Sequence, residues 1–181
     1  MSSTTHLMTA EELIDLPDDG NRYELVQGVL LTMSASGADH GLVTMNVSVL
    51  LTNYIKTNNL GVAFAAETGF KLESDPDTVL APDFAFIRRE RNPPRSRGYA
   101  EMAPDLAVEV NSSTKNRRYV ERKAAQWLSF GVQSVWVVSC QKRAVEVLSA
   151  NGSRVLFNES DELTDEHVRP GFRVRVAEIF N

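Results

Sequence analysis

The stretch Leu106-Ala107-Val108-Glu109-Val110 alternates large apolar side chains with small or polar ones, which is the pattern of a β-strand. Leu106, Val108 and Val110 fall on one face of this strand, and Ala107 and Glu109 fall on the other. Glu109 is therefore a carboxylate near the end of an otherwise apolar strand, with only a small side chain beside it. Functional sites are often found where a residue contradicts the pattern around it.

A second strand with the same feature is expected from Pro82 to Ile87. Here Phe84 and Phe86 share one face, and Asp83 lies on the other. If the two strands are neighbours, Asp83 and Glu109 can converge. Two close carboxylates repel each other unless a cation lies between them, and hard oxygen ligands with room for water suit Mg²⁺ or Mn²⁺. We therefore expect a metal site at Asp83 and Glu109; the alternative is that each carboxylate points into water at its strand end.

Lys123 is the third residue that departs from its surroundings. On the helix expected over 117–130, Val120, Ala124 and Trp127 recur at helical spacing and define the packed face. Lys123 projects along the edge of that face. Two interpretations remain open: its stem covers Trp127 while the ammonium stays in water, or the ammonium lies beside the carboxylates, where it orients a water and offsets charge on a phosphate under attack.

The remaining pattern predicts the order of the other elements. The chain is short enough for a single domain over 1–181. A core of helix, three strands, helix and strand is typical of an α/β (α+β) fold with a mixed central sheet, here with added N- and C-terminal hairpins. The expected elements are a capped helix beginning at Thr9, a hairpin over 22–33, a buried amphipathic helix over about 42–55, strands over 62–72, 81–87 and 106–110, the helix over 117–130, a strand over 134–139, a hairpin of 144–149 and 154–157, and an extended stretch over 172–176.

Composition bounds the class of protein. The chain is 43% hydrophobic and 24% charged, which is average for a soluble globular protein. Its apolar runs fall far short of the roughly 18 residues of a membrane-spanning helix, and its first residues lack the features of a secretory signal. Cys140 is the single cysteine, so an internal disulfide is excluded. We therefore expect a cytoplasmic protein with no membrane partner.

Charge is distributed unevenly along the chain. The net charge is −5, yet the segments 88–97 and 115–123 each hold five basic residues and one glutamate. They are either two solvated loops or a positive rim that holds DNA phosphates. Since each follows a strand that carries one of the two carboxylates, we expect both at the same end of the sheet. The residues expected to contact DNA are Arg88, Arg89, Arg91, Arg95, Arg97, Lys115, Arg117 and Arg118.

Several strings of the sequence resemble one family. They are Arg22 to Gly28 (RYELVQG), Ala66 to Phe70 (AETGF), Ala81 to Phe86 (APDFAF), Pro104 to Val110 (PDLAVEV), Gly131-Val132 before Val135 to Val138 (VWVV), and Pro170 to Phe172 (PGF). In number, order and spacing they are similar to the Uma-two family of restriction-endonuclease-like proteins, from about Thr9 to Phe180. The resemblance implies the PD-(D/E)XK nuclease fold, with Asp83 and Glu109 as its two acidic residues.

The resemblance also bears on the lysine and on further polar residues. The usual lysine position, two residues after Glu109, holds Asn111. Branches of the superfamily in which the lysine has moved to the following helix imply Lys123 instead. Glu24, in the first strand, and His40, near the start of the long helix, recur in the family pattern. Glu24 is expected to add a carboxylate to the site; otherwise it is a solvated strand residue. His40 is otherwise a helix-start histidine with an ordinary hydrogen bond.

Glu67 is expected in the strand preceding Asp83, as an additional metal ligand, or else as a charge on an edge strand. The chain also departs from the family pattern at three positions besides Asn111. Gln27 and Lys115 stand where an acidic residue is common, and Ser113 stands where a proline is common.

Two functions from different classes remain open. The first is a metal-dependent endonuclease that hydrolyses phosphodiester bonds of DNA. The second is a nuclease-fold module with weak or no catalysis that binds nucleic acid or a protein partner, because a fold does not fix a function. Glycoside hydrolysis by two carboxylates is less supported, since Trp127 and Trp136 read as core residues. Exposed strand edges of the two hairpins also predict a homodimer.

Overall fold

The computed structural model describes residues 6–91, 97–113, 117–168 and 171–181. The chain divides into two compact units, and each is described by itself. The first unit comprises Met1–Ala35, Glu67–Ala81 and Pro93–Ala103, and the second comprises Ser36–Ala66, Pro82–Asn92 and Pro104–Asn181. The single domain expected over 1–181 stays a prediction.

The first unit is a small antiparallel sheet with one short helix. The helix α1 (Ala10–Ile14) begins with the predicted capping box, in which Thr9 and Glu12 each bind the other's main chain. The predicted hairpin is also confirmed: Gln27 and Gly28 both have positive φ and form its two-residue turn. The sheet has the order β2-β1-β5-β4 and consists of β1 (Arg22–Val26), β2 (Val29–Met33), β4 (Phe70–Glu73) and β5 (Thr78–Leu80).

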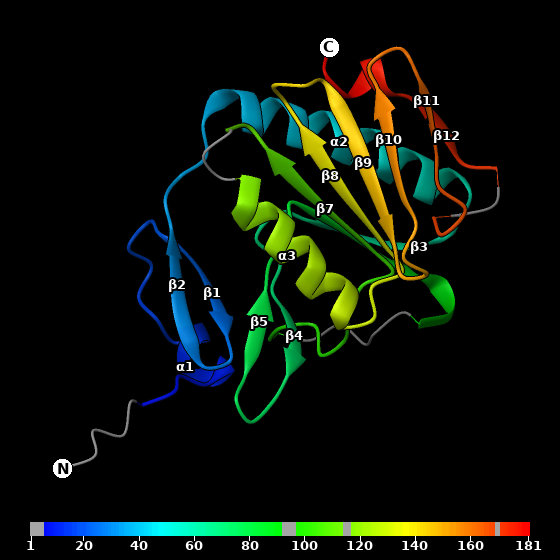
Figure 1. The fold of residues 1–181 in the computed structure, drawn as a ribbon. Helices are drawn as coiled ribbons and strands as arrows, with labels where there is room; N and C mark the ends of the chain where they lie inside the picture. Colours follow the sequence, from blue (N-terminus) through cyan, green and yellow to red (C-terminus); the bar gives the residue numbers. More distant parts are fainter. Residues whose placement is uncertain (1–5, 92–96, 114–116, 169–170) are drawn as a thin grey trace. The chain divides into compact units, whose positions relative to one another are not determined.

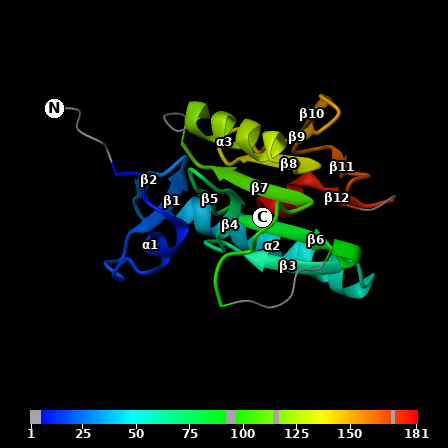
Figure 2. The ribbon, with the colours of Figure 1, turned by 90° about the horizontal axis from the view of Figure 1, so that it is seen from below.

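The second unit is a six-stranded sheet with the order β10-β9-β8-β7-β6-β3. Its strands are β3 (Gly61–Ala65), β6 (Phe84–Arg88), β7 (Leu106–Asn111), β8 (Ser134–Ser139), β9 (Ala144–Ser149) and β10 (Arg154–Asn158). Neighbouring strands are antiparallel except for β7 and β8, which are parallel and joined through α3 (Arg117–Ser129). The helices α2 (Ala38–Thr57) and α3 cover opposite faces of the sheet (Figures 1 and 2). The predicted mixed sheet, with helix, three strands, helix and strand in that order, is confirmed.

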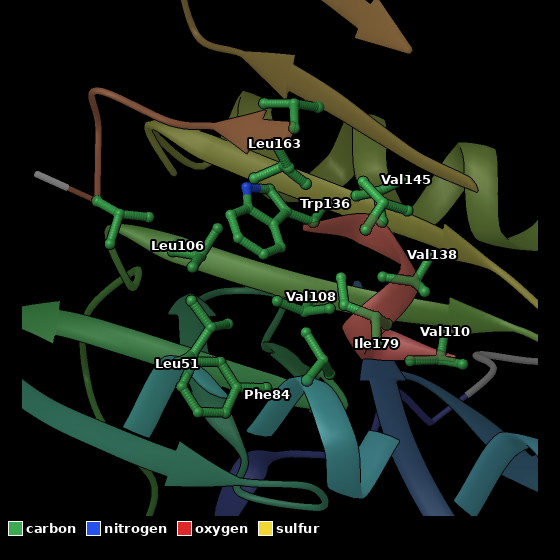
Figure 3. Close-up of a cluster of buried hydrophobic side chains, with 14 of the residues drawn as sticks. Leu51, Phe84, Leu106, Val108, Val110, Trp136, Val138, Val145, Leu163 and Ile179 are labelled. Carbon is green, nitrogen blue, oxygen red and sulfur yellow. The ribbon is translucent and has the colours of Figure 1, made fainter. Parts of the chain in front are cut away.

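The main core of this unit lies between α2 and the sheet. Along α2, Val43, Val47, Leu51 and Ile55 recur every four residues and form one buried stripe. They pack against apolar side chains of β6, β7, β8 and β9, many of which are shown in Figure 3. The C-terminal segments close the same core through β11 (Glu162–Thr164), β12 (Arg173–Arg175) and the short helix η3 (Val176–Ile179).

Three details of the expected secondary structure are wrong. The strand expected over 62–72 is two strands, because Glu67 adopts a left-handed backbone (φ 68°) in the turn between β3 and β4. The three-residue strands β5 and β11 were not expected, since so short a run shows no alternation. Leu42 and Val49 lie in the helix that was expected to be buried over about 42–55, but they are exposed because they lie beside the buried stripe.

The helices were compared with the length and hydrophobicity that a membrane-spanning helix requires. Within the described ranges, none is both long and apolar enough to span a lipid bilayer.

Candidate active site

The strand pairing brings Asp83 and Glu109 to the same end of the sheet. Phe84 pairs with Val108 across antiparallel β6 and β7, so one further step places Asp83 opposite Glu109. The Asp83 main-chain N donates to the Val108 carbonyl at 3.0 Å, and its Oδ2 accepts from the Val110 N at 2.7 Å. Directly opposed residues of such a pair have Cα atoms about 4.5–5.5 Å apart. Both carboxylates are buried, so neither points freely into water.

Glu109 is held by two donors from α3. Its Oε1 lies 3.0 Å from Lys123 Nζ and accepts a hydrogen bond from Trp127 Nε1 at 2.7 Å. Lys123 and Trp127 are four residues apart and therefore share one face of the helix. Lys123 is only 5% exposed, so the interpretation that leaves its ammonium in water is wrong. The packing of α3 across β7 thus delivers a cation to the buried carboxylate.

Asn111 occupies the strand position where the superfamily usually has its lysine. It is half-buried at the end of β7, and its Oδ1 accepts from the Ser113 N at 3.1 Å. The strand itself therefore supplies no cation two residues after Glu109. Lys123 reaches the carboxylate from the helix instead, as the resemblance implied.

His40 joins the same end of the sheet from α2. Its Nε2 lies 3.2 Å from Asp83 Oδ2, and its Nδ1 lies 3.3 Å from Thr44 Oγ1, one helical turn later. Which ring nitrogen donates depends on the tautomer, and the contact is an ion pair only when the ring is protonated. The structure thus pairs His40 with Asp83 and Lys123 with Glu109, at neighbouring ends of β6 and β7.

The pKa of the Cys140 thiol is affected by charges at this end of the sheet. Cys140 follows β8, its main-chain N donates to the Asn111 carbonyl, and its Sγ lies 4.0 Å from the Asp39 carbonyl oxygen. Burial raises the pKa of the Cys140 thiol, and the negative charges of Asp39 and Asp83 raise that pKa further. The negative charge of Asp83 therefore affects the pKa of a residue that is not its hydrogen-bond partner.

The other two acidic residues expected at the site belong to the first unit. Glu24 is buried in β1 and its Oε1 accepts from the Ala81 N at 2.9 Å, so the interpretation as a solvated strand residue is wrong. Glu67 was expected in a strand, but it lies in the turn after β3, is exposed, and faces Arg22 at 3.9 Å. A part for either residue in the metal site stays a prediction.

The metal site expected at Asp83 and Glu109 stays a prediction. Within the described ranges, no three His, Cys, Asp or Glu residues are grouped closely enough to hold a metal ion. Mg²⁺ does not need such a cage, since it keeps several waters and is commonly bound through one or two carboxylates. Two buried carboxylates at one strand end, accompanied by one lysine, provide this kind of donor set.

The described start of the first basic segment lies away from Glu109. Because β6 and β7 are antiparallel, the chain leaves β6 at the end opposite to the one where it leaves β7. The expectation that both segments flank the same end of the sheet is therefore wrong for residues 88–91. Arg88 and Arg91 bind the buried Asp105 there, through contacts of 2.7–2.9 Å to its Oδ1. Their guanidinium groups stabilise the fold at the end away from Asp83.

The other residues expected to contact DNA lie in different parts of the structure. Arg89 is exposed in the short helix η1 (Arg89–Arg91), at the same end as Asp105. Arg97 is exposed in the first unit. Arg118 is exposed in the first turn of α3, close to where the chain leaves β7. Arg95, Lys115 and the side chain of Arg117 lie outside the described residues.

Trp127, which the sequence assigned only to the core, also contacts the candidate site. It is fully buried, as expected, but its indole N–H donates to Glu109. A buried tryptophan usually finds a partner for this N–H. Trp127 lies four residues after Lys123, on the same helix face. This spacing in the sequence could have indicated that both side chains reach the same acceptor.

Comparison with known proteins identifies the family and supports the fold. The model of the Uma2 family, described as "Putative restriction endonuclease", matches residues 10–177. No curated protein matches the sequence. Among solved structures, the chain is similar to one described as a "putative nuclease belonging to DUF820" from Anabaena variabilis, at 17% identity and a TM-score of 0.81 over 96% of this chain and 97% of that one. At this identity the likeness establishes the shared nuclease-like fold. The family match, which spans nearly the whole chain, establishes that this protein belongs to the Uma2 family.

Proposed function

We propose that this protein is a Mg²⁺-dependent endonuclease that hydrolyses phosphodiester bonds of DNA, with Mn²⁺ as a substitute metal. The observation that carries the proposal is the buried contact of Lys123 Nζ with Glu109 Oε1, on the strand neighbouring Asp83. A lysine and two carboxylates at one strand end match the needs of phosphodiester cleavage. The description of the family as a restriction endonuclease supports the nuclease class.

Each residue has a chemical role in this proposal. Asp83 and Glu109 would hold Mg²⁺, which when bound polarises a phosphate oxygen and lowers the pKa of a water. Lys123 donates hydrogen bonds toward the attacking water and balances charge that develops on the phosphate oxygens. His40 holds Asp83 from α2, and Trp127 holds Glu109 from α3. These two contacts fix the carboxylates, which keeps their orientation from being lost when substrate binds.

The DNA backbone would be held by the basic residues at this same end of the sheet. Arg118 is exposed at the start of α3, and Lys142 is exposed in the turn after β8, whose end lies beside the end of β7. Lys115 and Arg117 adjoin Arg118 in the sequence. Arg88 and Arg91 take no part, because they bind Asp105 at the opposite end.

Cleavage of supercoiled plasmid and of labelled duplex and single-stranded oligonucleotides tests the activity. We expect nicked or linear products with Mg²⁺ or Mn²⁺, none with EDTA, and none from Asp83→Asn. Calorimetric titration with Mg²⁺ should show a site that Asp83→Asn lacks. Equal metal binding by both proteins would remove Asp83 from the site.

The salt dependence of DNA binding tests the basic residues. Replacing Arg118 with alanine should reduce the slope of log K against log salt by about 1, the value for one phosphate contact. Arg89→Ala is the matched control, since that arginine is exposed at the opposite end. If only Arg89→Ala changed the slope, DNA would bind at the Asp105 end.

One observation favours the second function, a nuclease-fold module with weak or no catalysis. Glu109 Oε1 already has two donors, so the network around it is a stable buried arrangement without metal. Such a module would bind nucleic acid or a protein partner. Retained DNA binding by wild type, with no Mg²⁺ uptake in calorimetry and no cleavage, would support this function over the first.

A further inference from the structure

The hydroxyl of Thr44 contacts the ring of His40, one turn earlier on α2. Thr44 Oγ1 lies 3.3 Å from His40 Nδ1, and within the described ranges this is the sole side-chain hydrogen bond of Thr44. In the middle of a helix, such a hydroxyl often binds the main-chain carbonyl four residues earlier. Here it binds a side chain instead. Because residues four apart lie one above the other on a helix, Thr44 is placed to fix the orientation of that ring.

The other nitrogen of the same ring faces the carboxylate of Asp83. His40 Nε2 lies 3.2 Å from Asp83 Oδ2. Turning an imidazole ring over exchanges its nitrogens with its carbons, so an unrestrained ring can present a C–H to Asp83. The Thr44 hydroxyl disfavours the turned ring, because Nδ1 would lose its partner. It does so in both charge states, since a hydroxyl donates to a neutral Nδ1 and accepts from a protonated one.

The contacts of the Asp83 carboxylate fall on one of its two oxygens. Oδ2 accepts from the Val110 main-chain N at 2.7 Å and faces His40 Nε2. Within the part of the chain that the structure describes, Oδ1 has no hydrogen-bond partner. The two contacts therefore fix Oδ2 and leave Oδ1 as the oxygen that can accept a further group.

We propose that Thr44 is a positioning residue of this site. It holds the ring of His40, the ring holds Oδ2 of Asp83, and Oδ1 is thereby presented to the metal. The part that concerns the metal rests on the proposed function, whereas the orientation of His40 and Asp83 does not. Partners that orient a metal ligand change metal affinity or activity by about 10- to 100-fold when they are lost. Thr44 acts one residue further out, so we expect a loss of about threefold to tenfold.

Three substitutions isolate the effect of the hydroxyl. Thr44→Val replaces the hydroxyl with a methyl group, and Thr44→Ser keeps the hydroxyl. Thr52→Val is the matched control, because Thr52 is half-buried on α2 like Thr44 but lies about 12 Å further along the helix. Threonine, serine and valine have similar helix propensities, so all three variants should stay folded. Circular dichroism and urea unfolding measure this.

Nuclear magnetic resonance of the metal-free full chain tests the orientation. The chain has three histidines, and a spectrum of His40→Asn identifies the ring signals of His40. In Thr44→Val the ¹⁵N resonance of Nδ1 should shift, because its partner is lost. The Val110 amide should also lose protection from hydrogen exchange, since Asp83 Oδ2 is held less firmly. Thr44→Ser and Thr52→Val should resemble wild type. Wild-type signals at both places in Thr44→Val would overturn the proposal.

Calorimetric titration with Mg²⁺ tests the part that concerns the metal without relying on activity. The dissociation constant should rise by about threefold to tenfold in Thr44→Val. It should keep its wild-type value in Thr44→Ser, which restores the hydroxyl, and in Thr52→Val. Equal binding of Mg²⁺ by wild type and Thr44→Val would remove Thr44 from the site.

Cleavage kinetics separate this proposal from the proposed function. At a fixed Mg²⁺ concentration, kcat should fall in Thr44→Val by a similar factor, with KM for DNA unchanged, because Thr44 holds no phosphate. If wild type neither binds Mg²⁺ nor cleaves DNA, while the His40 and Val110 signals change as expected, the proposed function fails and Thr44 still orients Asp83. If wild type binds Mg²⁺ and cleaves, and Thr44→Val matches it in every measurement, the proposal for Thr44 fails alone.

Discussion

The same dipeptide, Pro-Asp, precedes both central strands, yet the two aspartates have opposite surroundings. Pro82-Asp83 precedes β6 and Pro104-Asp105 precedes β7, and the strands are antiparallel, so the aspartates lie at opposite ends of one strand pair. Asp105 is fully buried and accepts from the guanidinium groups of Arg88 and Arg91 and from the Arg88 main-chain N. At the other end, Asp83 lies opposite a second carboxylate, that of Glu109.

The balance of charge separates a structural end from a candidate active end. At Asp105, two cations serve one carboxylate, and both arginines are partly exposed, so their remaining charge stays hydrated. At the other end, each of the two buried carboxylates has its own partner: Lys123 contacts Glu109, and the imidazole of His40 contacts Asp83. Of the two ends, the carboxylates outnumber the Lys and Arg side chains only at Asp83 and Glu109. The position of an aspartate before a strand is therefore not enough to identify the site.

The largest effect is expected for the cation at the candidate active end. Lys123→Met should lower the rate of DNA cleavage by about 10²- to 10³-fold, because electrostatic stabilisation of the transition state is lost. Rates should be measured well below the unfolding temperature, since Glu109 loses its buried partner and the fold is weakened.

Two variants sharpen the Lys123 test. Lys56→Met changes an exposed lysine and should cleave at the wild-type rate. Adding Asn111→Lys to Lys123→Met should restore part of the rate, if a lysine from the strand reaches the same centre. Cleavage by folded Lys123→Met at the wild-type rate would show that Lys123 only neutralises Glu109.

A matched pair of amide substitutions should separate the two ends by stability. Asp105→Asn should lower the free energy of unfolding by about 2 kcal/mol, a value reduced to allow for the exposure of its arginines. Asp83→Asn should change it by less than about 1 kcal/mol, because the amide oxygen can still accept from Val110 and repulsion from Glu109 is relieved. Urea unfolding without metal measures the free energy of unfolding of both variants. Equal losses in the two variants would show that Asp83 and Asp105 contribute equally to stability.

Trp127→Phe tests whether the hydrogen bond from Trp127 to Glu109 supports catalysis by holding the carboxylate in place. The variant keeps most of the buried ring and loses the N–H that donates to Oε1. We expect a loss of about 1 kcal/mol in unfolding free energy and roughly a tenfold loss in kcat, with little change in KM. A purely structural role would lower stability and leave kcat per folded molecule unchanged.

The smallest effect is expected at Cys140, which reports the charge on Asp83. Negative charge raises the pKa of the Cys140 thiol, so removing that charge lowers the pKa and increases the thiolate fraction at pH 8. Alkylation by iodoacetamide should be faster in Asp83→Asn than in wild type. Mg²⁺ should accelerate it in wild type and have no effect on Asp83→Asn. Asp105→Asn, at the other end, should alkylate at the wild-type rate.

The local elements followed from patterns within single segments. The capping box at Thr9, the turn at Gln27 and Gly28, and β8 are all as expected, because hydrogen bonds and side-chain alternation between close neighbours determine them. The strand expected over 62–72 failed because a single left-handed residue, Glu67, divides it. Leu42 and Val49 are exposed in the helix that was expected to be buried, since the apolar pattern of a helix does not say which of two apolar rows meets the sheet.

By itself, the sequence determined which residue types are anomalous, namely carboxylates at the ends of apolar strands and a lysine on the edge of a packed helix face. Tertiary structure decided how these residues combine. Antiparallel pairing of β6 with β7 put the Arg88 segment at the Asp105 end, and the crossing of α3 over β7 placed Lys123 and Trp127 on Glu109. The physical reason is that strand direction and helix placement depend on contacts between segments distant in the chain, whereas periodicity reports only which face of its own segment a residue occupies.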